Sequence, residues 1–222
     1  MEIISKIQKS ILNQFGGAPE SEYFYLTGGT ALAEFYLKHR KSNDLDFFTT
    51  TEEIIVSFSH RLEETLKNNE MNVKRQRGLR SFVELFIDNG KESTIIHIAL
   101  DSSFRFEELK EFPAYPKLKV DSLVDIASNK LLALFSRATL RDFIDVYTLV
   151  KKGYFKPDDL IEKAKNKDPG FDLYWLGVAF ERIKSFKNDA PAMLLLAEPV
   201  SLQDLVSFFD EWRRGIVNKI KP

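Results

Sequence analysis

The order in which two kinds of sequence pattern occur along the chain constrains its fold more than any other feature. Short strand-like runs occur before residue 101, at residues 23–26, 45–48, 71–76, 81–88 and 93–100. Asn89-Gly90 between the last two runs is a strong hairpin signal. From Asp121 onward nearly everything repeats at helical spacing. We therefore expect an α+β protein, with a mixed β-sheet and flanking helices followed by a C-terminal helical bundle.

Helical spacing also predicts where the helices lie. In the first half it predicts helices over residues 3–15, 31–39 and 54–66, and in the second half over 123–136, 140–151, 158–165, 173–184 and 202–217. Residues 104–116 are charged and carry two prolines, which predicts a loop. We expect two domains, residues 1–110 and 111–222.

Composition excludes several classes of protein. The 222 residues contain no cysteine, which rules out disulfides, thiolate zinc sites and cysteine nucleophiles. The 32 Lys and Arg residues nearly balance the 33 Asp and Glu residues, so we do not expect bulk-charge binding to nucleic acid. No apolar run approaches the ~18 residues of a membrane span, and the charged N-terminus does not read as a signal peptide. We expect a cytoplasmic protein with no membrane partner.

A glycine pair lies between a predicted strand and a predicted helix. Gly28 and Gly29 let the backbone turn sharply and expose N–H groups at a helix N-terminus, where an anion can bind, and Thr30 adds a hydroxyl. A plain tight turn fits the same residues.

Two aspartates stand two residues apart on the next predicted strand. Asp44 and Asp46 therefore point to the same face, while Leu45 and Phe47 point to the other. Adjacent carboxylates repel unless a cation lies between them, and Mg²⁺ prefers oxygen ligands and substrate phosphates. A solvated strand face is the alternative interpretation.

Two compound motifs, in the same order, resemble the nucleotidyltransferases of the AbiEii/AbiGii toxin family in the DNA-polymerase-beta-like superfamily. The first is Gly-Gly-Thr at 28–30 with Arg-x-Ser-x-Asp-Leu-Asp-Phe at 40–47. The second is Asp-Ile-Ala-Ser-Asn-Lys at 125–130, then Arg137 and Arg-Asp-Phe-Ile-Asp-Val-Tyr at 141–147. The resemblance covers residues 26–150 and implies a nucleotidyltransferase-like sheet in the first half.

The resemblance implies a role for each matched residue. Asp44 and Asp46 would bind one or two Mg²⁺ ions, or Mn²⁺ in their place, that bridge the phosphates of an NTP. The residues that would hold the nucleotide or the turn beside it are Gly28, Gly29, Thr30, Arg40 and Ser42. Lys130 would contact the triphosphate or base, and Asp145 would hold Lys130 or the nucleotide. Arg141 and Asp142, on the same helix, would also contact the nucleotide. Ordinary surface cations, and helix-stabilising pairs such as Arg141 with Asp145, are the alternatives.

The sequence departs from the superfamily where a later strand usually supplies a third carboxylate. His97 occupies that position as we align it, and Asp101 lies further along the same face. Asp101 is the candidate third acid. A neutral histidine accepts a proton near pH 7 but does not neutralise Mg²⁺. A structural histidine at the sheet edge fits equally well.

The leading hypothesis is a Mg²⁺-dependent nucleotidyltransferase that moves NMP from an NTP to an acceptor hydroxyl. By resemblance it is the toxin of a type IV-like toxin–antitoxin or phage-defence pair, with a cognate antitoxin and an RNA acceptor such as a tRNA. A nucleotide-binding or partner-binding module with the same fold but weak catalysis is the alternative, and a metal-dependent nuclease is a third hypothesis. The basic run at Lys74, Arg75, Arg77 and Arg80 fits either an RNA backbone or a solvated hairpin.

Overall fold

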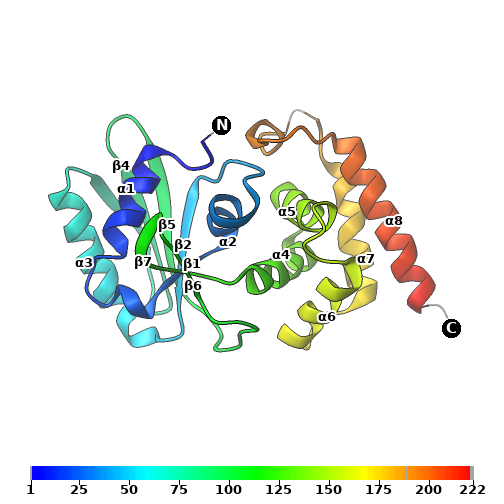
Figure 1. The fold of residues 1–222 in the computed structure, drawn as a ribbon, viewed down its shortest axis with the longest axis horizontal. Coiled ribbons are helices and arrows are strands. Elements are labelled where there is room, and N and C mark those ends of the chain that lie inside the picture. The colour runs from blue at the N-terminus through cyan, green and yellow to red at the C-terminus, as the bar shows by residue number, and fades with distance from the viewer. Residues whose placement is uncertain (1, 189, 221–222) are drawn as a thin grey trace. The chain divides into compact units, whose positions relative to one another are not determined.

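A computed structural model describes residues 2–188 and 190–220 and shows the α+β class predicted from the sequence (Figure 1). The chain divides into two compact units, Met1–Leu123 and Val124–Pro222. The first unit holds the sheet and the second is helical. Within the described residues, no helix combines the length and the apolar character needed to cross a membrane.

The first unit is built on one mixed seven-stranded sheet with the order β3-β4-β5-β2-β1-β7-β6. Its strands are β1 (Tyr25–Thr27), β2 (Asp44–Thr49), β3 (Asn72–Gly78), β4 (Phe82–Asp88), β5 (Ser93–Leu100), β6 (Lys110–Phe112) and β7 (Tyr115–Val120). The β2–β5 and β1–β7 pairs are parallel, and the other neighbours are antiparallel. The hairpin expected at Asn89-Gly90 joins β4 to β5.

Alternating burial gives the central strands two different faces. Buried and half-exposed residues alternate along β2, β4 and β5, and the two end residues of β5 are exposed. The helices α1 (Lys6–Phe15) and α3 (Ile55–Asn68) cover the buried face (Figure 1), where Phe15 stacks on Phe47 with ring centroids 3.7 Å apart. The opposite face carries Asp44 and Asp46.

The segment predicted as a loop over residues 104–116 is in part strand, and that prediction was wrong for its second half. β6 pairs with β7 and extends the sheet beyond β1. Pro116 is tolerated inside β7 because the β6–β7 register shifts beside it, and a bulge or an edge strand accepts a proline. The high charge and the two prolines of this segment are typical of a loop, which is why the sequence did not predict an edge strand here.

The helix after β1 begins earlier than predicted. α2 (Gly28–Ala31) includes both glycines, and the chain continues as a π-helical segment, η2 (Leu32–Leu37). Lys38 ends the segment in the left-handed conformation, with φ of 52°. The glycine pair is therefore the first turn of a helix rather than a separate loop.

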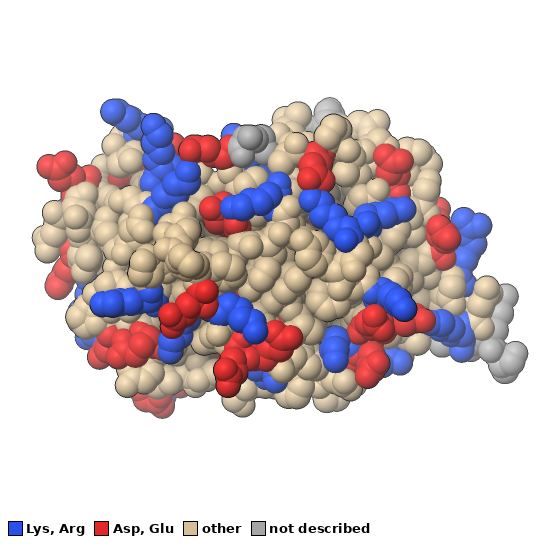
Figure 2. Space-filling model, in the orientation of Figure 1, with Lys and Arg blue, Asp and Glu red and all other residues tan. Residues whose placement is uncertain are grey.

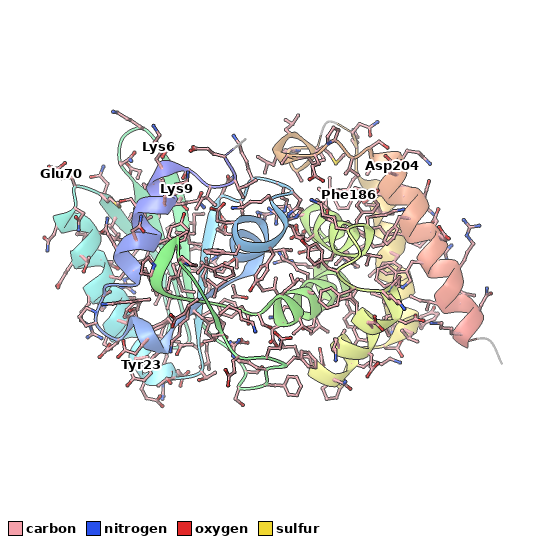
Figure 3. All side chains as sticks on the ribbon, viewed as in Figure 1. Lys6, Lys9, Tyr23, Glu70, Phe186 and Asp204 are labelled. Atoms are coloured by element: carbon pink, nitrogen blue, oxygen red, sulfur yellow. The ribbon has the colours of Figure 1, made fainter. Side chains whose placement is uncertain are left out.

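The second unit is a helical bundle. Its helices are α4 (Leu123–Arg137, whose first residue belongs to the first unit), α5 (Leu140–Lys151), α6 (Pro157–Lys167), α7 (Leu173–Glu181) and α8 (Leu202–Ile220), with short 3₁₀ turns η4 (Arg182–Ser185) and η5 (Met193–Leu195). The core is aromatic, and Phe209 packs against Phe143 and Phe180. Asp204, labelled in Figure 3, and Ser201 cap each other at the start of α8.

Candidate functional site

The carboxylate pair, Asp44 and Asp46, lies on the half-exposed face of β2 as predicted. Asp46 approaches the glycine turn, residues 27–30, so closely that a Cβ added to Gly28 would stand 3.0 Å from Asp46 Cγ and closer still to Oδ2. The β1–β2 register, which pairs Thr27 with Asp46, explains this approach. The Asp46 side chain is 26% exposed, so the arrangement is not sealed by packing.

Only glycine fits at position 28. Its φ of 72° lies in the left-handed region, and the Asp46 carboxylate fills the space that a side chain would need. The hydroxyl of Thr27, the residue before α2, makes no helix cap and donates instead to Asp121 (2.8 Å). The Thr27 side chain therefore does not cover the N–H groups at the start of this helix. An anion site needs such uncovered N–H groups.

Arg40 lies beneath the same turn. A Cβ added to Gly29 would stand 2.7 Å from Arg40 Nη2 and 3.2 Å from Ser42 Oγ. Arg40 is only 2% exposed, and its Nη1 donates to the Lys41 carbonyl. Thr30 donates to the Asp44 carbonyl, which ties the helix to β2. The structure thus brings together every residue of the first motif that the resemblance singled out.

His97 stands beside Asp46 on β5. Its Nδ1 lies 2.9 Å from Asp46 Oδ1, and its Nε2 lies 3.3 Å from Glu84 Oε2 on β4. The hydrogen bond with Asp46 raises the pKa of His97 above its ordinary value; burial opposes this shift, and the nearby charges of Asp46, Asp44 and Glu84 add to it. The sequence interpretation missed Glu84, because its place opposite His97 depends on the register of the hairpin.

Asp101 directly follows the end of β5 and is held by other groups. It accepts a hydrogen bond from the Tyr25 hydroxyl, and Arg105 Nη2 lies 3.9 Å away. Burial first, and then this bond, raise the pKa of Tyr25, so its hydroxyl keeps the proton that it donates. Arg105 also pairs with buried Asp121 at 2.6 Å. These contacts favour a structural role for Asp101, and its role as third acid stays a prediction.

In the second unit Lys130 and Asp145 form a buried ion pair. Lys130 Nζ lies 2.9 Å from Asp145 Oδ2, and the two side chains are 10% and 0% exposed. One of the two roles that the resemblance implied for Asp145 was to hold Lys130, and the ion pair is consistent with that role. Asp125, the first residue of the same motif, pairs instead with Lys167 at 2.9 Å.

Asp142 caps α5. Both its oxygens are engaged, by the Arg137 guanidinium and by the backbone and hydroxyl of Thr139. Burial alone would raise the pKa of Asp142, but the hydrogen bonds from Arg137 and Thr139 outweigh it and hold the pKa below its usual value. These bonds favour a structural role over the predicted nucleotide contact. Arg141 is exposed on the same helix.

The basic run divides between paired and exposed residues. Arg75 pairs with Glu63 at 2.6 Å, and Arg80 pairs with Glu52 at 2.9 Å. Lys74 and Arg77 are exposed on β3, an edge strand of the sheet. Basic and acidic side chains are interspersed on the face seen in Figure 2, in agreement with the net charge of −1.

Comparisons with known proteins identify a sequence relative and several structures with a similar fold. At 28% identity over 184 residues, the chain matches an uncharacterized protein of Aquifex aeolicus (strain VF5), covering 78% of this chain and 80% of that one. JHP933 from Helicobacter pylori has a similar fold, with a TM-score of 0.60, 20% identity, and coverage of 97% of this chain and 90% of that one. The nucleotidyltransferase toxin MenT4 from Mycobacterium tuberculosis H37Rv is also similar, with a TM-score of 0.58, 15% identity, and coverage of 97% and 82%.

The profile of one protein family matches residues 10–206, which is most of the chain. That family is described as the nucleotidyl transferase AbiEii toxin of type IV toxin–antitoxin systems. The chain belongs to the AbiEii nucleotidyltransferase toxin family.

Proposed function

We propose that this protein is a Mg²⁺-dependent nucleotidyltransferase that transfers NMP from an NTP to an acceptor hydroxyl. The observation that carries the proposal is the approach of Asp46 to the glycine turn, because it brings a carboxylate pair and a phosphate-binding helix start to one place. Membership of the AbiEii family supports the general activity.

The donor set of the first unit fits a divalent cation that is shared with substrate. Mg²⁺ is usually held by one or two carboxylates together with substrate phosphates, rather than by an all-protein cage. Asp44 and Asp46 provide two carboxylates on one face, and no group of three or more His, Cys, Asp or Glu residues suited to a metal occurs in the described parts of the chain. When bound, Mg²⁺ would neutralise phosphate charge and favour ionisation of the attacking hydroxyl.

The residues of the glycine turn perform the binding steps in this proposal. The N–H groups at the start of α2 donate to phosphate oxygens of the NTP, where the helix dipole favours negative charge. Arg40, which lies under Gly29, adds positive charge to the same place. Thr30 uses its hydroxyl to fix the turn against β2, so it positions the turn rather than the phosphate.

We propose an RNA acceptor, such as a tRNA, and a cognate antitoxin. The type IV toxin–antitoxin description of the family supports the antitoxin, and MenT4 is itself a nucleotidyltransferase toxin. The RNA acceptor is a proposal that rests on the family resemblance. Lys74 and Arg77, exposed on the edge strand β3, are candidates to contact an RNA backbone. The nucleotide-binding roles of Lys130 and Asp145 stay predictions.

Incubation with α-labelled NTPs, Mg²⁺ and total RNA tests the proposal. The wild-type chain is expected to label RNA, and Asp44→Ala and Asp46→Ala to abolish the label. Asp88→Ala is a matched control, since Asp88 lies on the same face of the sheet and bonds to Asn72 and Gly90 at the hairpin end, four residues from His97 in the strand pairing. Labelling that survives in both aspartate variants would refute the assignment.

A nucleotide-binding module without turnover is the second candidate. The contact of His97 with Asp46, at the position where the superfamily usually has an acid, favours it. Calorimetric titration with NTP and Mg²⁺, read beside the transfer assay, separates the two: tight binding without product over hours supports the module. Cleavage of RNA without any NTP would instead support a nuclease.

A further inference from the structure

A row of polar side chains crosses the half-exposed face of the sheet at the level of Asp46. The strand register pairs Asp46 with His97 and His97 with Glu84. Residues paired directly on neighbouring strands share a face, so the three side chains meet. His97 bridges them through Nδ1 at 2.9 Å from Asp46 and Nε2 at 3.3 Å from Glu84.

The imidazole of His97 is held from three directions. Asp46 and Glu84 engage its two nitrogens, and the Phe82 ring lies against it with centroids 5.6 Å apart and an interplanar angle of 32°. Its side chain is only 24% exposed, which limits other rotamers. His97 is therefore a fixed neighbour of Asp46.

This neighbour distinguishes the two oxygens of Asp46. Oδ1 lies against the imidazole, whereas Oδ2 lies against the glycine turn. A carboxylate commonly bridges two cations by giving one oxygen to each. While His97 is in place, it competes for Oδ1, and Oδ2 is the Asp46 oxygen that faces the turn.

We propose that His97, supported by Glu84, is a positioning residue that engages one oxygen of Asp46 and limits the carboxylate pair to a single divalent cation. The inference rests on the proposed function, and it selects one of the two ion counts that the family resemblance left open. Replacing the imidazole with a carboxylate would release Oδ1 and add ligands for a second ion beside Asp46.

The test is the stoichiometry and affinity of Mn²⁺ binding to the full chain, measured by electron paramagnetic resonance of free Mn²⁺. Wild type is expected to bind one ion that Asp46→Asn removes, and His97→Asp is expected to bind two. Glu84→Gln is expected to keep the stoichiometry at one but to weaken the affinity by about 10-fold, because it loosens the histidine that orients Asp46. Asp88→Asn, on the same strand and face as Glu84, serves as the control and should bind Mn²⁺ like wild type.

Circular dichroism checks that each variant is folded, and Glu84→Gln keeps the inference testable if His97→Asp does not fold. Two Asp46-dependent ions in wild type, in a chain that still labels RNA, overturn this inference and leave the proposed function standing. Equal Mn²⁺ affinity in Glu84→Gln and Asp88→Asn also overturns it. A wild-type chain with no Asp46-dependent ion and no transfer of label overturns both.

Discussion

Replacing Gly28 with alanine perturbs the approach between the glycine turn and Asp46. The left-handed φ of 72° costs an L-residue about 1–2 kcal/mol. The new Cβ would also stand 3.0 Å from Asp46 Cγ, so the carboxylate must leave its position, at a further cost of about 0.5–1.5 kcal/mol for an off-rotamer side chain. We expect Gly28→Ala to lower the free energy of unfolding by about 1.5–3.5 kcal/mol and to weaken Mn²⁺ binding.

Gly90 provides the matched control. Its φ is 78°, but nothing lies within 4 Å of an added Cβ. Gly90→Ala should therefore lower the free energy of unfolding by only the backbone cost of about 1–2 kcal/mol, and it should bind Mn²⁺ like wild type. Urea denaturation gives the stability difference, and Mn²⁺ titration gives the affinity. Equal losses of stability and equal Mn²⁺ affinities in the two variants would refute the reasoning.

Three further predictions follow from the ion pairs. Asp145→Ala should lower the free energy of unfolding by about 3–5 kcal/mol, because it leaves the buried Lys130 ammonium without its carboxylate. Urea denaturation measures the loss, and a loss below that of a surface mutation would contradict the prediction. Asp46→Asn should lower the pKa of His97, measured by NMR titration, because Asp46 is the main cause of its upward shift; an unchanged pKa would show that the contact is not formed. The pKa of Asp142 is lower in the folded than in the unfolded chain, so its ionised carboxylate stabilises the fold above the unfolded pKa, and this contribution is lost as the pH falls through the folded pKa. Asp142→Asn should therefore be less stable than wild type at neutral pH, and the difference in unfolding free energy should close below about pH 4. A difference that stays constant with pH would contradict the assignment.

Regular periodicity let the sequence predict the elements with strong patterns. The strand at 93–100 and the helix at 140–151 appear in the structure with the predicted bounds. In the helix apolar residues recur at helical spacing, and the strand is a largely apolar run that follows the Asn-Gly turn signal. β6 and β7 were missed because they are short, charged and interrupted by prolines, which removes the period-two signal.

The candidate site was predicted only as far as local spacing reaches. Asp44 and Asp46 share a face because residues two apart on any strand do so. Glu84 was not found, because an Asn-Gly signal alone does not fix the loop length. Asn89 Oδ1 accepts from the backbone N–H groups of residues 91 and 92, and Asp88 pairs with Ser93 across a four-residue loop, so Glu84 lies opposite His97. A two-residue turn would shift this register by two residues.

The burial of Arg40 was equally beyond the sequence. An arginine in a polar stretch is usually exposed, and only the packing of the glycine turn against residues 40–42 encloses its guanidinium. The close approach of Gly28 to Asp46 likewise depends on the pairing of β1 with β2 rather than on either segment alone.

A comparison of α-labelled and γ-labelled NTP in the presence of Mg²⁺ and RNA tests the central claim most directly. Nucleotidyl transfer moves the α-phosphorus to the acceptor and releases pyrophosphate, so only the α-label should appear in RNA, and it should disappear in Asp46→Ala. Label from the γ-position in RNA, or α-label that persists without the Asp46 carboxylate, would contradict this account of the protein.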